Sequence, residues 1–236
     1  MKVKNVLDKV VTLFREFGVG GGLLYACDRM LSRVSSNLRV HAYELTVQPI
    51  AGAPASPRRA SKLRIREVGY DDPAMARMPV RPAVMQARKA QHATCLGAFR
   101  NETLVAYMWF CRDTYDEDEV RCTYVLPAGD GCVFDFDFYV FPEHRMGTAF
   151  AALWNGATEF LNERGVRETW GRLTRFNLAS RRAHGHLGAR VAGRAVFIRL
   201  GALEIMCASL APYVHVSLTR RVRLRLVAAE SGALAE

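Results

Sequence analysis

The chain has 236 residues, of which half are hydrophobic, and its 33 lysines and arginines against 23 acidic residues give a formal charge of +10. This length allows one large domain with appendages, and the hydrophobic fraction is sufficient for a sizeable core, so we expect a globular protein. The six cysteines form no CxxC pair and no cluster with zinc-ligand spacing, which indicates reduced thiols and no metal site. No hydrophobic run reaches the roughly 20 residues that span a bilayer, and no signal-peptide pattern follows the start, so a cytoplasmic location is expected.

The positive charge is spread along the chain. It forms no basic stripe interleaved with aromatic residues and fits no helix-turn-helix, RRM or zinc-finger pattern, so nucleic acid is not an expected partner. Anionic cofactors and anionic membrane surfaces remain open as partners of a basic chain.

The first fifty residues form an expected amino-terminal helical extension. From Val3 to Phe17 the hydrophobic residues have helical spacing, with basic residues on the remaining faces, and the glycines at 18, 20, 21 and 22 interrupt the pattern. A second helical pattern covers Leu23 to Val34, and a strand is expected at Ala42 to Val47. Two interpretations stay open: the helices pack on the main domain, or the first is a cationic interfacial helix that holds the protein on the inner face of a membrane.

A linker and a main domain follow. Residues 51–62 are rich in Pro, Ala and Ser, which predicts a linker, and residues 63–200 alternate between strand and helix patterns. Strands are expected at 63–68, 94–99, 104–110, 120–126, 132–141, 168–173 and 189–199, and helices at 146–164 and 177–187. The segment 77–92 is helix-like but broken by Pro79 and Pro82. Residues 201–236 are expected to complete the sheet with a strand at 214–227 and to end in a frayed tail. The fold class is therefore α/β, with a mixed sheet flanked by helices.

The strand at 132–141 carries two carboxylates. Its alternation predicts one face lined by Asp135 and Asp137. The opposite, core face consists of Phe134, Phe136, Phe138 and Val140. A carboxylate next to a reaction centre can act as a general base, and a solvated or salt-bridged role is the alternative.

The stretch YVFPEHRMGTAF, residues 139–150, joins this strand to the clearest helical pattern in the chain. The first turn of a helix leaves backbone N–H groups unpaired and carries partial positive charge, and small residues let an anion approach these groups. Arg145 adds formal charge, and Gly147 and Thr148 are small. The turn therefore predicts a phosphate-binding site, with an ordinary strand-to-helix turn as the alternative.

A second pattern lies further along the chain and consists of Asn177, Ser180, His184, Gly188 and Ala189. Together with the turn His144–Ala149 and its V-x-P-E lead-in at Val140–Glu143, it resembles the GNAT superfamily of N-acetyltransferases. That family has a Q/R-x-x-G-x-G/A motif between its fourth strand and the following helix, where backbone amides hold the pyrophosphate of acyl-coenzyme A. Here His144 stands where Gln or Arg is usual, and His184 stands where the family often has a tyrosine.

The resemblance covers about residues 63–200 and implies a GNAT-like mixed sheet that binds acetyl-CoA or another acyl-CoA as cosubstrate. In the family two parallel strands splay apart to hold the pantetheine arm, and the acceptor enters from the opposite side. The residues that the resemblance implies in cofactor binding are Phe138, Tyr139, Val140, His144, Arg145, Met146, Gly147, Thr148, Ala149, Asn177 and Ser180.

Amide formation needs a base that takes a proton from the amine, and an acid can protonate the leaving thiolate. Asp137 is the expected base, with Asp135 as the alternative, because the resemblance puts Asp137 nearer the reaction centre. His184 is the expected acid or proton relay because it takes the tyrosine position of the family. The acidic run at Asp113 and 116–119 either attracts a cationic acceptor or is a solvated loop.

We therefore expect a GNAT-type N-acyltransferase that moves an acyl group, acetyl in the simplest case, from acyl-CoA to the primary amine of a small molecule such as an amino sugar or amino acid. One alternative is transfer from an acyl carrier protein to make a lipidic N-acyl product at the membrane. The other is a catalytically silent module that only binds acyl-CoA. The acceptor, the acyl chain length and the oligomeric state stay open at the level of sequence.

Overall fold

The computed structural model describes residues 2–50, 63–129, 131–145 and 148–227. In chain order its elements are α1 (Lys2–Val34), β1 (Leu38–Pro49), β2 (Arg64–Glu67), the 3-10 helix η1 (Pro73–Arg77), α2 (Pro82–Ala90), β3 (Thr94–Arg100), β4 (Thr103–Cys111), β5 (Thr114–Asp116), β6 (Cys122–Val125), β7 (Cys132–Val140), the 3-10 helix η2 (Pro142–His144), α3 (Ala149–Asn162), β8 (Glu168–Thr174), α4 (Leu178–His186), β9 (Arg190–Leu200), β10 (Leu203–Ala208), β11 (Val214–Ser217) and β12 (Val222–Arg225). The predicted linker at 51–62 lies outside the described residues.

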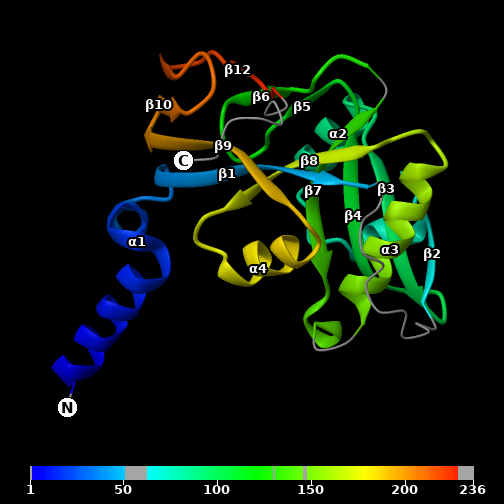
Figure 1. Cartoon of the computed structure of the whole chain (residues 1–236), viewed down its shortest axis with the longest axis horizontal. Coiled ribbons are helices and arrows are strands. Elements are labelled where there is room, and N and C mark those ends of the chain that lie inside the picture. Colours follow the sequence, from blue (N-terminus) through cyan, green and yellow to red (C-terminus); the bar gives the residue numbers. More distant parts are fainter. Residues whose placement is uncertain (1, 51–62, 130, 146–147, 228–236) are drawn as a thin grey trace, which may run out of the picture.

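A nine-stranded mixed sheet forms the centre of the molecule, in the order β11-β10-β9-β1-β8-β7-β4-β3-β2, and a second sheet has the order β12-β6-β5 (Figure 1). In the large sheet β7 and β8 run parallel, whereas its other neighbouring strands pair antiparallel. The predicted class, an α/β fold with a mixed sheet flanked by helices, is confirmed.

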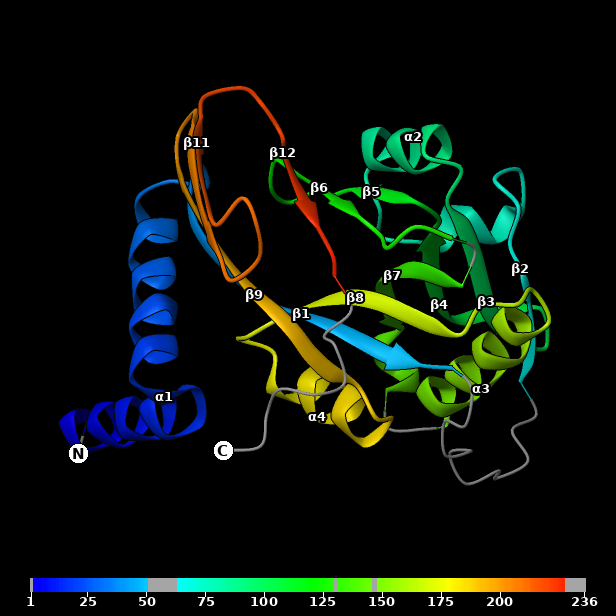
Figure 2. The same ribbon diagram turned by 45° about the horizontal axis from the view of Figure 1, so that its top comes forward.

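Hydrophobic cores lie on both faces of the large sheet. Helices α3 and α4 cover one face, and α2 and the small sheet lie on the other (Figure 2). Helix α3 buries one stripe with helical spacing, as its sequence predicts: Ala149, Leu153, Trp154, Ala157 and Leu161. Gly156 lets this helix approach β2 closely, because a Cβ atom at this position would lie 2.6 Å from Ile65 Cγ1. The α3 face and the α2 face of the large sheet thus have different surroundings.

The helix-like pattern at 77–92 is broken at its prolines, as the sequence predicts. The structure has η1 at Pro73–Arg77 and α2 at Pro82–Ala90, with an extended segment between them. Pro82 occupies the first turn of α2, where its missing N–H costs nothing, whereas a proline inside a helix breaks the hydrogen-bond ladder. The two prolines, Pro79 and Pro82, thus divide the pattern.

Strand β1 lies inside the sheet, between β8 and β9. Its register runs from Tyr43–Thr174 to Pro49–Glu168 on one side and from Leu38–Leu200 to Val47–Arg190 on the other. We expected this strand within the amino-terminal extension of residues 1–50. The sequence did not indicate its neighbours because they lie more than a hundred positions away in the chain.

Helix α1 projects from one end of the sheet (Figure 1). It changes direction at Gly18, whose φ of 69° is a left-handed conformation that glycine adopts without steric cost. This confirms the interruption that the glycines predicted, while the side chains of residues 2–14 lie outside the described part. Among the described residues, no helix is both long and hydrophobic enough to cross a membrane.

At the carboxyl end the single strand predicted at 214–227 is two strands. β11 extends the large sheet beyond β10, a strand that was not predicted. β12 joins the small sheet beside β6. The residues between them, from Leu218 to Arg221, include three polar side chains that are exposed. The expected completion of the sheet by residues 201–236 therefore holds only for β10 and β11.

Candidate active site

The large sheet opens between β7 and β8. These parallel strands pair from Cys132–Glu168 to Asp135–Gly171, and the described residues beyond form no further register although both strands continue. Main-chain N–H and C=O groups along the opening lack the neighbouring strand as a hydrogen-bond partner. This is the splayed pair of strands that the family resemblance implied.

A bulge in β7 lies at this opening. Asp137 has a φ of 48°, and the register of β7 with β4 shifts between Tyr107 and Trp109. The extra residue reverses the order in which side chains alternate between the two faces.

The bulge corrects the face that we predicted for this strand. The aromatic side chains before it pack on the α2 side, and those after it pack on the α3 side, which separates Phe134 and Phe136 from Phe138 and Val140. Asp135 and Asp137 do not share a face as expected. The Asp135 oxygens lie near the Cα of Gly171, and burial raises the pKa of Asp135 to about 7 despite the nearby Thr169 hydroxyl.

A cavity of about 490 Å³ lies over the opening on the α2 side of the sheet. Its walls include Asp137 and Tyr139 from β7 and Arg172 from β8, the two strands that separate beneath it. The other lining residues are Ser36, Arg39, His41, Pro79, Val80, Arg81, Val84, Arg88, Tyr107, Asp118, Glu119 and Arg199. The cavity is therefore strongly polar, with both signs of charge.

The buried guanidinium of Arg88 organises two acidic side chains in this cavity. Its Nη1 lies 2.8 Å from Asp137 Oδ2, and its Nη2 lies 3.7 Å from Asp118 Oδ2. Only 6% of the Arg88 side chain is exposed, and its guanidinium also lies over the rings of Trp109 and Phe136. Asp137 is therefore held in place as the nearest carboxylate partner of this buried cation.

Asp118 has the properties of a base near neutral pH. Burial, together with a hydrogen bond to Glu117 and the charge of Glu117, raises the pKa of Asp118 to about 6, against the opposing attraction of Arg88 and Arg172. A general base works best with a pKa close to the operating pH. Asp118 lines the same cavity as Asp137, so the structure adds a second candidate base.

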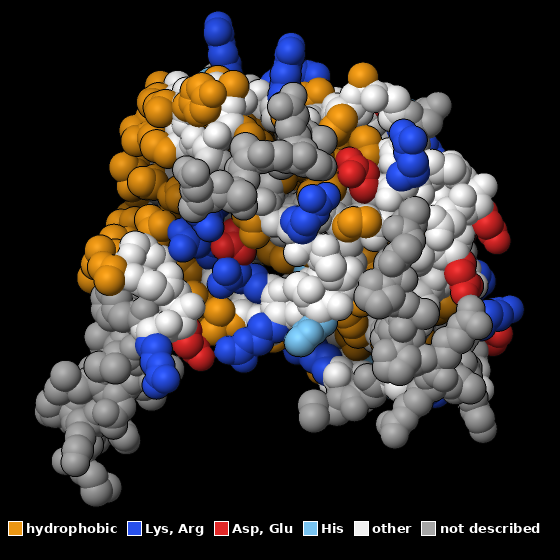
Figure 3. Space-filling view, viewed as in Figure 1, with side chains coloured by type: hydrophobic (Ala, Val, Ile, Leu, Met, Phe, Trp, Pro, Cys, Tyr) orange, Lys and Arg blue, Asp and Glu red, His pale blue; other side chains and the backbone are white. Residues whose placement is uncertain are grey.

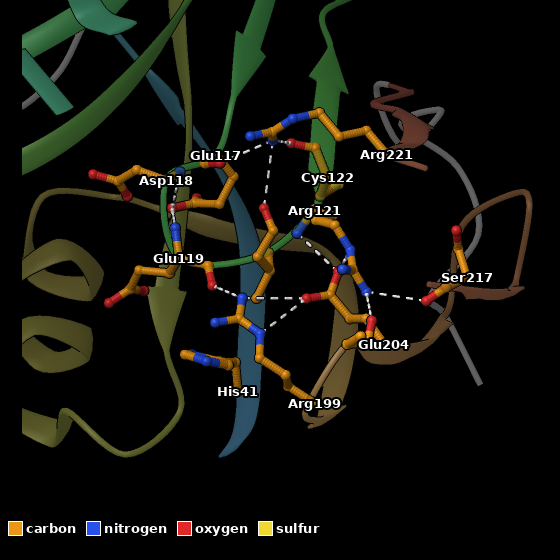
Figure 4. A network of polar contacts seen from close by, with 12 residues as sticks. His41, Glu117, Asp118, Glu119, Arg121, Cys122, Arg199, Glu204, Ser217 and Arg221 are labelled. Carbon is orange, nitrogen blue, oxygen red and sulfur yellow. Dashed lines mark hydrogen bonds and ion pairs between the residues drawn. The ribbon is translucent and has the colours of Figure 1, made fainter. Parts of the chain in front are cut away.

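The loop that carries Asp118 is held by a buried ion pair and by hydrogen bonds, and Figure 4 shows the contacts that Arg121, Arg221 and Glu204 make around it. Glu117 is fully buried, and both its carboxyl oxygens accept from Arg172, at 2.5 and 2.8 Å. Arg221 donates to the Glu117 carbonyl at 2.9 Å, and the backbone N–H of Arg121 donates to Glu204 of β10 at 2.8 Å. Within the acidic run, Glu117 is buried and Asp118 and Glu119 line the cavity, whereas Asp113 and Asp116 are exposed away from it.

His184 lies on the other face, between α4 and α3. It is buried, and its ring packs edge-on against Phe150 and Trp154 with centroid distances of 6.2 and 5.8 Å. Gln48 Nε2 donates to the Leu187 carbonyl at 3.1 Å, which leaves Gln48 Oε1 to accept from His184 Nδ1 at 3.3 Å. Burial lowers the pKa of His184 to about 4, so its ring is neutral at pH 7.

The lowered pKa of His184 makes a prediction about acid stability. The unfolded chain binds the proton near pH 6.5 and the folded chain only near pH 4, so stability is present above pH 6.5 and is lost as the pH falls towards 4. We expect His184 to account for a loss of roughly 3 kcal/mol between pH 7 and pH 4. Urea unfolding at both pH values should show this loss in the wild type and a correspondingly smaller loss in His184→Gln. An equal loss in the two proteins would mean that His184 is not protonated on unfolding in this range.

The turn before α3 is partly described. Residues 142–144 form η2, and Arg145 is exposed, donates from Nε to the Val140 carbonyl at 3.1 Å and lies 5.7 Å from the Tyr139 ring. Thr148 is the exposed N-cap of α3 without a side-chain capping bond, and Ala149 is buried. The predicted residues Met146 and Gly147 lie outside the described part of the chain.

The remaining predicted cofactor residues are divided between the two faces. Phe138 and Val140 pack toward α3, with Phe138 4.6 Å from Phe150 between ring centroids, whereas Tyr139 stacks on Tyr107 at 5.3 Å on the cavity side. Asn177 caps α4 by accepting from the Ser180 backbone N–H at 3.0 Å, as its sequence position predicted. These last two residues are thus explained by helix capping.

The sequence analysis missed Arg88 and did not single out Asp118 within its acidic run. Arg88 lies in a segment that reads as an exposed, proline-broken helix, and nothing local indicates that one of its arginines is buried. A run of four acidic residues, 116–119, was the available signal for Asp118. Its raised pKa depends on burial and on Glu117, which is held by Arg172 from a strand far along the chain.

No family model and no curated protein matches the chain. Similar solved structures include a functionally unknown conserved protein from Staphylococcus epidermidis, at 13% identity with a TM-score of 0.51, covering 73% of this chain and 66% of that one. A tandem GNAT protein from the clavulanic acid biosynthesis pathway is 17% identical with a TM-score of 0.49, and the match covers 68% of this chain and 53% of that one. A putative GNAT acetyltransferase from Novosphingobium aromaticivorans is 17% identical with a TM-score of 0.45, and the match covers 67% of this chain and 63% of that one.

The fold is GNAT-like. It has the opening between two parallel strands, and the first of these strands leads through a short turn into a helix. The chain spans between half and two thirds of the length of these three structures. At such low identity the comparison concerns the fold, and the chemistry rests on the residues of this chain.

Proposed function

We propose that the protein is an N-acyltransferase that moves an acyl group, acetyl in the simplest case, from acyl-CoA to the primary amine of a small molecule. The observation that carries this proposal is the opening between β7 and β8, which has the turn before α3 on one face and a polar cavity on the other. A thioester held in such an opening can be attacked from the cavity side while its nucleotide part stays on the α3 side.

On the donor side, the residues around the start of α3 suit an anion. The N-terminal N–H groups of this 14-residue helix carry partial positive charge, and its first turn has no acidic residue that would compete for them. Arg145 adds a guanidinium that makes no ion pair within the described residues. We assign pyrophosphate binding to this turn and the pantetheine arm to the backbone of residues 138–140.

On the acceptor side, we assign the base to Asp118. The amine must lose a proton before or as its nitrogen attacks the thioester carbonyl, and the C–S bond then breaks to release the thiolate. Asp118 can take that proton and pass it to solvent through the cavity. Asp137, held by Arg88, then orients the amine as a hydrogen-bond acceptor. The mixed charges of the cavity suit a polar acceptor such as an amino sugar or an amino acid.

For the leaving thiolate, we assign a positioning role to His184. Its neutral ring keeps Nδ1–H on Gln48, which leaves Nε2 as an acceptor and makes His184 a poor proton donor at pH 7. A thiolate is a stable leaving group, since ordinary thiols ionise with a pKa near 8.5, so release without a dedicated acid is chemically reasonable. His184 instead fixes α4 against α3 through its contacts with Trp154 and Gln48.

Thr148→Glu tests the donor side. A carboxylate at the helix N-cap is compatible with the fold, and it even favours the helix dipole, but it repels a bound pyrophosphate. We expect the dissociation constant for acetyl-CoA, measured by titration calorimetry, to rise at least tenfold. Thr148→Ser, the matched control, should bind as the wild type does. Equal binding by the glutamate variant and the wild type would contradict the assignment of this turn.

A further inference from the structure

A hydrophobic surface patch lies away from the candidate active site. Among the described residues, the exposed large hydrophobic side chains all come from two segments, α1 and the chain from β9 onward. Figure 3 shows hydrophobic side chains gathered along one side of the molecule, over β10 and the upper turns of α1. Single exposed hydrophobic residues are ordinary on protein surfaces, but a gathering of them marks an interaction site.

The α1 part of this patch is a stripe along one helix face. It consists of Val19, Leu23, Met30 and Val34, which are 70%, 54%, 60% and 78% exposed. Their spacing places them on one side of a helix. The opposite side is fixed to the sheet, because buried Asp28 accepts from the Val40 backbone N–H and from Arg39, each at 2.9 Å. The stripe therefore faces outward.

The second part is the edge of the large sheet. Among the described residues, β11 is the last strand on this side and pairs with β10 alone. Val214 and Val216 on this strand are 61% and 57% exposed, and Tyr213 and Leu218 at its ends are similarly exposed. An exposed hydrophobic edge is unfavourable in water unless a partner covers it.

The charges around the patch are mainly positive. In residues 17–49 and 190–227 the acidic residues are Asp28, Glu44 and Glu204, each buried and ion-paired with an arginine. Next to the patch in the chain, Arg29, Arg33 and Arg220 are exposed, and Glu16, one turn before Val19, is the exposed acid. A surface that is hydrophobic and mainly positive is complementary to anionic lipid.

We propose that this patch, α1 residues 19–34 together with β11, binds the surface of an anionic lipid bilayer. The hydrophobic stripe enters the region between headgroups and acyl chains, and the arginines pair with lipid phosphates. A second copy of the chain is a poorer occupant, because a symmetric interface would bring the arginines of both copies together with fewer acids than arginines to pair them.

The hydrophobic patch lies close in the chain to residues that line the cavity, so membrane binding would affect which acceptors reach the cavity. Val34 ends the stripe, and Ser36 and Arg39, which follow in the chain, line the cavity. Bound in this way, the protein holds the cavity near the membrane surface. An amine that carries a lipid tail could then present its head group to the cavity while its tail stays in the bilayer.

Vesicle flotation of the full chain tests the proposal. With vesicles of phosphatidylcholine and phosphatidylglycerol at physiological salt, the wild type should float, and with phosphatidylcholine alone it should remain at the bottom. Arg29→Gln/Arg33→Gln should lower the partition coefficient about fivefold for each arginine. Met30→Ser/Val34→Ser should lower it at least as much, because hydrophobic insertion is lost. Val191→Ser is the matched control, since this exposed valine lies at the other end of β9, and it should bind normally.

Three results would overturn the proposal. The wild type could stay at the bottom of the gradient with anionic vesicles. It could float with undiminished affinity in both double variants, which would assign binding to another part of the chain, such as residues 2–17. Analytical ultracentrifugation could show a dimer that Met30→Ser/Val34→Ser dissociates, without vesicle binding, which would make the patch an interface between two copies. Far-ultraviolet circular dichroism confirms that the exposed substitutions leave the fold intact.

Discussion

Asp118→Asn is expected to lower kcat/KM by about 10² to 10³ while raising the melting temperature. The loss of rate follows because asparagine cannot accept the proton of the amine. The gain in stability follows because burial and Glu117 raise the pKa of Asp118 to about 6. A carboxyl whose pKa is raised on folding stabilises the fold below its unfolded pKa near 4, and this contribution is lost as the pH rises through 6. At pH 7 the folded protein therefore carries a cost that Asn removes.

The pH profile provides the measurement. In the wild type kcat/KM should fall as the pH drops below about 6, because the base becomes protonated, and this acidic limb should disappear in Asp118→Asn. Asp113→Asn is the matched control, since it removes one carboxylate from the same acidic region and its φ of 58° is tolerated by asparagine. If Asp137→Asn removed the limb and Asp118→Asn retained it, the base would be Asp137, as the sequence first suggested.

Glu117→Ala is expected to destabilise the protein by about 3–5 kcal/mol, which is the usual cost of breaking a buried ion pair by removing one member. Arg172 is 19% exposed and Glu117 is fully buried, so water cannot replace the lost carboxylate. Burial alone would raise the pKa of Glu117, but the charge and hydrogen bonds of Arg172 outweigh it and hold the pKa below its ordinary value. The stability from this pair is present above the unfolded pKa and is lost as the pH falls below it.

The control for this prediction uses the same arginine. Glu119 also contacts Arg172, at 2.8 Å, but its side chain is 49% exposed. Glu119 also accepts from the Tyr43 hydroxyl at 2.8 Å, so Glu119→Ala should cost more than a purely exposed ion pair but clearly less than Glu117→Ala. Urea unfolding of both variants measures the difference. Similar free energies of unfolding for the two variants would contradict the view that Glu117 anchors the cavity wall.

The sequence predicted local structure well where hydrophobic spacing or a glycine decided it. The stripe of α3, the cap at Asn177 and the interruption of α1 at Gly18 all follow from residues within one or two turns. The alternation of β7 failed at Asp137 because a bulge is a property of the strand pair, and no residue type demands one there.

The candidate site was predictable only in outline. The opening between β7 and β8 beyond Asp135–Gly171 could be predicted, because the motif around Arg145 is visible in the sequence and its resemblance implies such an opening. Asp118 gains its raised pKa from Glu117 and burial, and Glu117 is held by Arg172, fifty-five positions away. Ion pairs between distant strands leave no local pattern, so the acidic run could not be told from a solvated loop.

The central position of β1 has a consequence for how the chain folds. During synthesis this strand is made first, yet its partners in β8 and β9 follow roughly 120 residues later, and such non-local pairing slows folding. Until then β1 is unpaired, and the residues that it buries in the folded protein are exposed to water, which favours aggregation. If the chain were cleaved between residues 51 and 62 and the amino-terminal fragment removed, β8 and β9 would lose the strand between them. A peptide of residues 38–49 added in trans should then occupy that place. Assembly of the large sheet thus depends on a strand that is made well before both of its partners.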